Sequence, residues 1–142
     1  MELYAEVLKL YAEGQRNFTW ANLENAKLTE ANLEKARLER ANLTEANLDG
    51  AKLAGANLTG AKLNWGSHDL IAEILRQNAG GNVQYLSFAG LLLMTRHECW
   101  DYYFALKLPK KVKAWIIETL KPYALADENC PKRFRELCEE GA

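Results

Sequence analysis

The chain of 142 residues is poor in cysteine and has no excess of either charge. Its three cysteines are an odd number without the spacing of a disulfide framework, which favours a reducing compartment. Eighteen Lys and Arg residues are balanced by nineteen Asp and Glu residues. A nearly neutral chain has no strong field to attract nucleic acid or an anionic membrane, so neither kind of partner is expected.

Long apolar runs and targeting signals are also missing from the sequence. The longest apolar stretch runs from Leu86 to Met94, is interrupted by Ser87 and is far shorter than a membrane-spanning helix. The first residues lack the basic and apolar regions of a secretory signal. We therefore expect a cytoplasmic protein with no membrane partner.

Motifs that indicate catalysis are scarce. Gly-rich phosphate loops, nucleophile elbows and His-Glu-x-x-His motifs are absent from the sequence. His68-Asp69 and His97-Glu98 are adjacent pairs, but neighbours on a helix point in different directions. We therefore expect no enzymatic activity, no catalytic residues and no cofactor.

A metal site has only weak support. His97, Cys99, Cys130 and Cys138 are residue types that bind zinc, but paired Cys-x-x-Cys spacing is missing. Cys99 lies in an apolar run, where a free cysteine usually behaves as a small hydrophobic residue. We therefore predict that no metal is bound.

The sequence does contain a repeat of five residues, present nine times without a gap from Ala21 to Trp65: ANLEN AKLTE ANLEK ARLER ANLTE ANLDG AKLAG ANLTG AKLNW. Every unit begins with Ala, has Leu third, and has Asn, Lys or Arg second. On an α-helix this period turns Leu by about 140° per unit, and on a flat strand it sends successive leucines to opposite faces. Leu and Ala point inward in every unit only if the backbone turns a corner each time, which predicts a solenoid.

These units resemble the pentapeptide-repeat family, and residues 16–20 fit as a tenth, leading unit with Phe18 in the Leu position. The resemblance implies a short right-handed quadrilateral β-helix of about 2.5 coils, with about twenty residues per coil. It does not identify one function, because the family is diverse. The expected core residues are Phe18, Leu23, Leu28, Leu33, Leu38, Leu43, Leu48, Leu53, Leu58 and Leu63.

Stacking at twenty residues would arrange the outward side chains in columns. Trp20 would fall in line with Arg40 and Gly60, so we expect its ring to lie over the Arg40 guanidinium. Stacked Asn and Arg side chains could form a ligand surface; alternatively, they are solvated groups that keep the surface soluble. The other columns are Asn17–Arg37–Asn57, Asn22–Asn42–Lys62 and Asn25–Glu45–Trp65, and the candidate interaction residues are Trp20, Arg37, Arg40 and Asn57.

The segments on either side of the repeat are predicted to be helical. Residues 1–15 are expected to form an N-terminal capping helix, amphipathic over residues 2–13, that covers the apolar end of the solenoid. Residues 66–142 are expected to form an α-helical domain, a bundle packed on the other end. Its expected helices run from Ser67 to about Asn78, from Val83 to about Arg96, from His97 to Lys107, from Pro109 to Lys121 and from Pro131 to Glu140.

The predicted helical domain contains further candidate interaction residues. Leu91, Leu92, Leu93 and Met94 cannot all face one side of a helix, so that helix is either central to the bundle or partly an interface. Lys110 and Lys111 belong to a basic cluster, which would suit phosphates or is simply the polar face of an amphipathic helix. The near-neutral domain favours the second interpretation.

The sequence therefore predicts a non-enzymatic protein-interaction or assembly module. Its partner would be another protein, or a second copy bound through the helical domain. The alternative is mimicry of DNA, because some pentapeptide-repeat proteins resemble duplex DNA and bind type II topoisomerases. That role requires a long acidic rod, whereas residues 16–65 predict a short rod with seven basic and six acidic residues.

Overall fold

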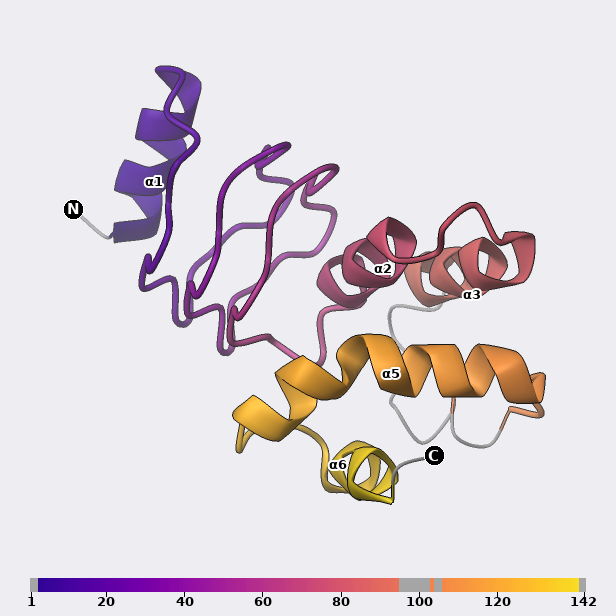
Figure 1. Cartoon of the computed structure of the whole chain (residues 1–142). Coiled ribbons are helices and arrows are strands. Elements are labelled where there is room, and N and C mark those ends of the chain that lie inside the picture. The colour runs from indigo at the N-terminus through magenta and orange to yellow at the C-terminus, as the bar shows by residue number, and fades with distance from the viewer. Residues whose placement is uncertain (1–2, 95–102, 104–105, 141–142) are drawn as a thin grey trace.

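The computed structural model of the chain describes residues 3–94, 103 and 106–140. Among these residues, helix α1 lies at one end of the repeat segment and the other helices lie at its opposite end (Figure 1). Most of the expected helix over residues 97–107 is outside the described residues. The helices are α1 (Leu3–Ala12), α2 (His68–Gln77), α3 (Val83–Met94), α5 (Lys110–Ala126) and α6 (Lys132–Glu139).

Each repeat unit turns one corner, as the five-residue period requires. The first-residue N–H of one unit donates to the third-residue carbonyl of the unit before, as Ala21 does to Phe18 at 3.0 Å. The fifth residue of each unit before the last has positive φ, between 58° and 66° at six non-glycine corners and between 70° and 73° at Gly50, Gly55 and Gly60. Positive φ at this place is the signature of a type II turn.

Successive turns of the repeat segment stack with a register of twenty residues. Phe18 N–H donates to the Arg37 carbonyl at 2.8 Å, and Arg37 N–H donates to the Arg16 carbonyl at 2.7 Å. These bonds place Asn17 beside Arg37 in a parallel bridge, and Arg37 beside Asn57 one turn later. The columns expected from the sequence at these positions are therefore present.

The prediction of a quadrilateral β-helix is wrong for this chain. The described residues contain no β-strand and no sheet, so the expected solenoid of strands is absent from residues 16–65. The parallel pairs are isolated bridges, each made by the second residue of a unit. A corner follows two residues after each bridge, so consecutive residues do not pair and a ladder cannot extend. The repeat segment is instead a stack of turns joined by isolated bridges.

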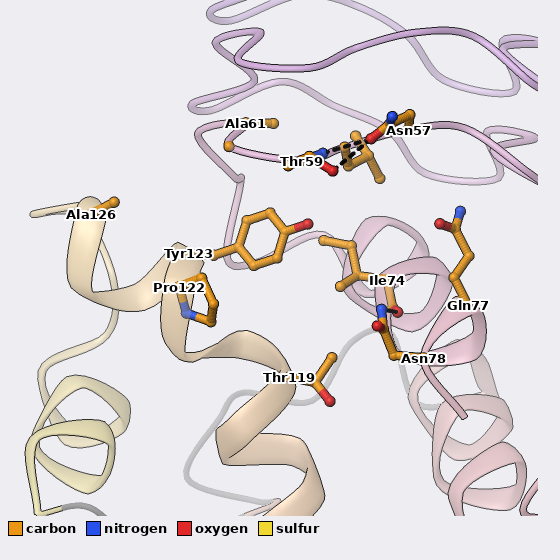
Figure 2. A pocket seen from close by; sticks show the side chains of 12 residues that line it. Asn57, Thr59, Ala61, Ile74, Gln77, Asn78, Thr119, Pro122, Tyr123 and Ala126 are labelled. Atoms are coloured by element: carbon orange, nitrogen blue, oxygen red, sulfur yellow. Dashed lines mark hydrogen bonds between the residues drawn. The ribbon is translucent and has the colours of Figure 1, made fainter. Parts of the chain in front are cut away.

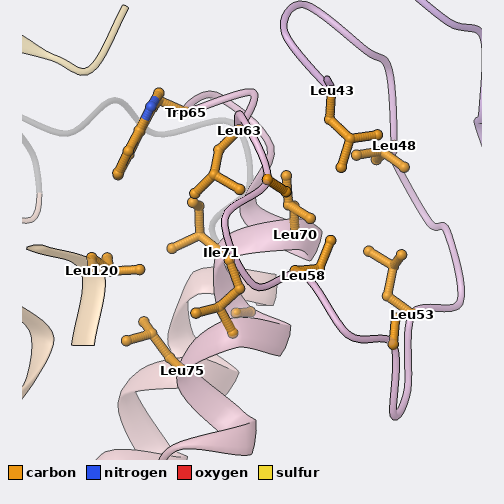
Figure 3. Close-up of a cluster of buried hydrophobic side chains, with 14 of the residues drawn as sticks. Leu43, Leu48, Leu53, Leu58, Leu63, Trp65, Leu70, Ile71, Leu75 and Leu120 are labelled. Atoms are coloured by element: carbon orange, nitrogen blue, oxygen red, sulfur yellow. The ribbon is translucent and has the colours of Figure 1, made fainter. Parts of the chain in front are cut away.

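The side chains inside the stack form its core. Phe18 is 6% exposed, and the nine unit leucines are each 4% exposed or less. At the first turn, Val7 of α1 is buried and the Tyr11 hydroxyl donates to the Glu34 carbonyl at 2.9 Å. At the last turn, the inward side chains face Leu70, Ile71 and Leu75 of α2, which close the apolar end (Figure 3). Each end of the core is thus covered by a helix.

Helix α2 begins where the repeat ends. Ser67, where the sequence predicts that this helix begins, is its N-cap, and its hydroxyl oxygen accepts the Leu70 N–H at 3.4 Å. Trp65, expected in a surface column, is only 5% exposed, so that expectation is wrong. The chain leaves the stack at this residue, and the indole packs on Phe134 and donates to Asp127 Oδ2 at 3.1 Å.

Helix α5 is longer than predicted. The expected end was Lys121, but the helix continues through Pro122 to Ala126. Leu120 and Ala124 are completely buried on either side of the proline, so tertiary packing outweighs its local cost. The predicted division into residues 1–15, 16–65 and 66–142 stays a prediction. In the part of the chain that the structure describes, no helix is long and apolar enough to cross a membrane.

Candidate functional site

The last turn of the stack has no following turn to pair with, and α2 replaces that turn along two of its units. Gly50 N–H donates to Asp69 Oδ2 at 3.3 Å, and Gly55 N–H donates to Glu73 Oε1 at 3.1 Å. One turn earlier, the equivalent N–H of Lys35 donates to a backbone carbonyl of the next turn at 2.9 Å. Carboxylates spaced four residues apart on one helix face therefore take the place of missing backbone acceptors.

Glu73 is held in place by neighbouring side chains. Arg76 donates to its two oxygens at 2.8 and 2.5 Å, and Gln77 Nε2 donates to Oε1 at 3.0 Å. Gln77 Nε2 also donates to the Ala56 carbonyl at 2.7 Å, which adds another cap to the edge. Burial by itself would raise the pKa of Glu73, but the hydrogen bonds from Arg76, Gln77 and Gly55 outweigh it and lower the pKa below 4.5.

In the next unit along the last turn, Gln77 caps the Ala56 carbonyl but two N–H donors are not capped. The N–H groups of Leu58 and Gly60 make no hydrogen bond to any of the described residues. One turn earlier, the equivalent Leu38 and Arg40 N–H groups donate to backbone carbonyls at 2.8 and 2.9 Å. The edge is open here because the unit lies beyond the stretch of α2 that supplies carboxylates to Gly50 and Gly55. Two backbone donors of this unit are therefore left beside the groove; the Leu48 and Leu53 N–H groups of the same turn likewise make no hydrogen bond to a described residue.

A groove of about 400 Å³ lies against this open edge, between the last turn, α2 and α5 (Figure 2). That volume is within the range of about 300–1,000 Å³ that is usual for ligand pockets. The ring of Tyr123 projects from α5 into the groove, towards Ile74 of α2 and the last turn (Figure 2). The groove is lined by Asn57, Leu58, Thr59, Gly60, Ala61, Ile74, Gln77, Asn78, Thr119, Pro122, Tyr123 and Ala126.

The lining of the groove is uncharged. Of its twelve residues, only Tyr123 has a titratable side chain, and burial raises the pKa of that phenol above 10.0. Tyr123 therefore keeps its proton at neutral pH and can donate a hydrogen bond. An uncharged groove with convergent donors can recognise carbonyl oxygens, but it offers no acid or base with a pKa near 7.

The stacked asparagines are engaged within their own units. Asn57 Oδ1 accepts the Thr59 N–H at 3.1 Å and the Thr59 hydroxyl at 2.7 Å, as Figure 2 shows. The side chains of Asn17, Asn22 and Asn42 accept the N–H two residues later in the same way. This bond explains why Asn recurs in the second position, and it favours the structural interpretation of the columns.

The other candidates on the repeat segment lie outside the groove. The Arg40 guanidinium carbon is 5.0 Å from the centre of the Trp20 ring, so the contact expected from the sequence is present. Trp20 is 67% exposed. Arg37 Nε donates to Glu39 Oε1 at 3.3 Å on the outer surface. Of the four repeat candidates, Asn57 alone borders the groove.

The candidates on the helices are also dispersed. Leu92 is completely buried, Leu91 is half-buried, and Met94 is 86% exposed at the end of α3. Lys110 and Lys111 are exposed in the first turn of α5. Neither α3 nor this first turn of α5 contributes to the groove. The structure therefore does not gather the sequence-predicted residues into one site.

Asn57 is the one groove residue among the sequence-predicted interaction residues; those not predicted include Gly60, Gln77, Thr119 and Tyr123. The sequence gives one usable signal, since Gly60 closes the last corner before the repeat stops. Tyr123 follows a proline and was therefore expected beyond the end of its helix. No sequence pattern indicates the angle at which α5 crosses the edge of the stack.

The residues considered for metal binding and catalysis have other environments. Cys130 and Cys138 are buried free thiols, and His97 and Cys99 are outside the described residues. Burial raises the pKa of Cys130 from 9.0 to about 12, which disfavours the thiolate that zinc requires. Within the described ranges, no group of three or more His, Cys, Asp and Glu side chains could hold a metal ion.

His68 and Asp69 also point to different partners. His68 Nδ1 lies 3.0 Å from the Leu92 carbonyl and 3.2 Å from the Tyr103 hydroxyl, in the interior of the helical part. Asp69 instead accepts the Gly50 N–H at the edge of the stack. The two side chains therefore do not act as a pair.

Comparison with known proteins identifies the repeat segment. A family model of pentapeptide repeats matches residues 17–53 and 26–64, with eight copies. This match confirms the resemblance that the five-residue units carry. No curated protein matches the chain.

Proposed function

We propose that this chain, in which residues 17–64 are a pentapeptide-repeat segment, is a non-enzymatic protein-interaction module that binds its partner in the groove. Pentapeptide repeats are compatible with such a role. The repeat segment supplies a backbone edge, and α2 and α5 supply the walls. The low and odd number of cysteines supports a cytoplasmic location, which is part of the same proposal.

The observation that carries this proposal is the open edge. Backbone donors inside the stack pair with the next turn, as those of Leu38 and Arg40 do, and α2 accepts the Gly50 and Gly55 donors at the last turn. At Leu58 and Gly60 the donors instead face a groove of about 400 Å³. A partner that supplies carbonyl oxygens would complete the pairing.

The chemistry of the groove favours recognition over catalysis. Tyr123 is the single titratable residue among the twelve that line it. Its pKa, raised above 10.0 by burial, makes it a poor base at neutral pH and a suitable hydrogen-bond donor. The groove can therefore position a bound segment without reacting with it.

The proposal is tested by blocking the groove in the full chain. Thr119 lines the groove, whereas Ala114 is exposed on the same helix and does not. We expect Thr119→Trp to lose a protein partner that the wild type captures, and Ala114→Trp to keep it. Circular dichroism and the unfolding midpoint establish that both variants are folded. Equal capture by the two variants would place the partner elsewhere and would contradict the proposal.

The wild-type chain and the Thr119→Trp variant also test self-association. The notable exposed apolar side chains of α3 are Val83, Leu86 and Met94, which are 75%, 41% and 86% exposed. Self-association through the helical part stays a prediction, and light scattering of the full chain measures it. A dimer that survives Thr119→Trp would place self-association outside the groove.

DNA mimicry remains a sequence-based alternative that no described contact favours. The repeat segment is slightly basic, with seven basic and six acidic residues over 16–65, whereas duplex DNA is uniformly negative. A supercoiling assay with a type II topoisomerase tests it. Inhibition at micromolar concentration would favour mimicry over the groove.

A further inference from the structure

We propose that the groove binds a short, uncharged and extended peptide segment of the partner, paired with the backbone of Leu58 and Gly60 in the register of the repeat. This inference rests on the proposed function of the groove and adds the chemistry of what it binds. The occupant is a polypeptide because the stack itself contains the same pairing one turn earlier.

The preceding turn provides the template. Leu38 N–H donates to the Asn57 carbonyl at 2.8 Å, and Arg40 N–H donates to the Thr59 carbonyl at 2.9 Å. The two acceptors are thus two residues apart on one chain, which is the spacing at which an extended segment presents carbonyls to the same side. Leu58 and Gly60 repeat these donors on the open edge. A parallel extended segment about 4.8 Å away would satisfy both.

The walls of the groove select the side chains of that segment. The residue between the two carbonyls would lie in the groove beside Ile74 and Pro122, since Leu58 itself is only 3% exposed and α2 already covers its inward side. An apolar side chain fits this position, because the lining has no charge to pair with a buried acid or base. The Tyr123 hydroxyl, which points into the groove in Figure 2, is an additional donor for a carbonyl of the segment.

Helix α2 limits the pairing to one segment. An exposed edge of unpaired backbone is a template for adding further chains. Asp69 and Glu73 already accept the Gly50 and Gly55 N–H groups, so a bound segment cannot extend along those units. The N–H donors of Leu58 and Gly60 remain available in the groove, whereas the Ala56 carbonyl of the same unit already accepts Gln77 Nε2. We therefore expect the edge to pair with one short segment and not to nucleate a larger stack.

The test uses a capped peptide with the sequence of residues 56–61, Ala-Asn-Leu-Thr-Gly-Ala. In the intact chain this segment is already paired with the equivalent edge one turn earlier. Titrated into the ¹⁵N-labelled full chain, it should produce saturable shifts of the Leu58 and Gly60 amide resonances. The same peptide with Glu in place of Leu should bind at least about tenfold more weakly, since a charge would enter an uncharged groove.

Two variants of the protein localise the effect. Thr119→Trp should abolish the shifts and Ala114→Trp should leave them unchanged. Tyr123→Phe keeps the ring and removes one donor, so it should weaken binding about two- to tenfold without unfolding the chain.

The outcomes separate this inference from the proposed function. Failure of the peptide to shift Leu58 and Gly60, while Thr119→Trp still loses a captured protein, would overturn the inference and leave the interaction module in place. Shifts confined to other residues, or equal binding of the Glu peptide, would also overturn it. If the peptide does not bind and Thr119→Trp still captures the partner, both the inference and the proposed function are contradicted.

Discussion

Glu73 on α2 accepts a hydrogen bond from the backbone N–H of Gly55 at 3.1 Å, across the boundary between the helical part and the repeat segment. One turn earlier, the equivalent Lys35 N–H pairs with the Ala54 carbonyl of the next turn. A side chain of one part of the chain therefore completes the hydrogen bonding of another. This relationship makes the stability of the stack depend on the helix that follows it.

Replacing Glu73 with alanine should destabilise the chain by about 1–3 kcal/mol. The change removes the acceptor of the part-buried Gly55 N–H and the partner of Arg76, and losing hydrogen bonds to a charged group costs about this much. Urea unfolding of the full chain measures the difference. Glu118→Ala, at an exposed position on α5, is the matched control and should change the stability by less than about 0.5 kcal/mol.

The same contact gives a pH dependence. Because the pKa of Glu73 is lowered below 4.5 in the folded state, its ionisation stabilises the fold above the unfolded pKa. That contribution is lost as the pH falls through the lowered pKa. The stability difference between wild type and Glu73→Gln should therefore shrink on acidification from pH 6 to pH 3. A difference independent of pH would show that the charge of Glu73 is not what stabilises the edge.

Replacing Gly60 with alanine should destabilise the chain more than the same change at a glycine with no neighbouring atoms. Its φ is +71°, and a Cβ there would lie 3.1 Å from Cγ of Arg40 in the turn before. Gly80 has a φ of +57° with nothing within 4 Å of the same Cβ, so Gly80→Ala measures the backbone strain alone. We expect about 1–2 kcal/mol of destabilisation from φ in both variants and a further loss in Gly60→Ala. Equal unfolding midpoints would show that Arg40 moves aside freely.

Within the repeat segment, the structural features that the sequence predicts correctly are those that follow its five-residue period. Leu58 is buried because its place in a five-residue unit is inward, and Arg37 lies beside Asn57 because the units stack every twenty residues. Both follow from the repeat alone. Strands do not follow from it, because one bridge residue between corners gives the correct inward pattern without a ladder.

The groove could not be predicted, because it depends on contacts between segments distant in sequence. Tyr123 reaches the last turn only because α5 continues past Pro122, which local preference alone would not allow. Asp69 appears in the sequence as the neighbour of a histidine, and nothing local indicates that it caps Gly50. Trp65 was misplaced for the same reason, since its burial requires Phe134 from the far end of the chain.

The contact of Trp20 with Arg40 should stabilise the first turns slightly. The guanidinium carbon lies 5.0 Å from the ring centre, and Trp20 is 67% exposed, so the interaction is a solvated cation–π contact. A double-mutant cycle with Trp20→Ala and Arg40→Ala should give a coupling of about 0.5–1 kcal/mol. A coupling of zero within error would mean that stacking places the two side chains together without an energetic gain.

The buried thiols should be unreactive in the folded chain. Burial raises the pKa of Cys130 to about 12 and also raises that of Cys138, so both remain protonated at pH 8. In a Cys99→Ala variant, we expect a thiol reagent to label neither residue until urea is added. Rapid labelling of one thiol in the folded protein would contradict this burial.

Raising the pH should also weaken the fold through these thiols. An unfolded thiol ionises near 9.0, whereas folded Cys130 keeps its proton up to about 12. The folded state therefore binds more protons in this range, and stability falls as the pH rises above about 9. Cys130→Ala should reduce this slope, which urea unfolding between pH 8 and pH 10 measures.

Pro122 should cost stability at its present position. It lies within α5, is exposed, and has no N–H to donate to the carbonyl of Glu118 four residues before it. Pro122→Ala restores this donor, so we expect a gain of about 1–3 kcal/mol and a higher melting temperature. Pro131 is the matched control, because it precedes the first residue of α6 and breaks no helical hydrogen bond. Pro131→Ala should therefore give no gain in stability.

A destabilised Pro122→Ala variant would contradict this prediction. It would mean that the packing of the proline ring in the wall of the groove stabilises the chain by more than the missing hydrogen bond destabilises it. Binding of the residue 56–61 peptide should then weaken in the same variant.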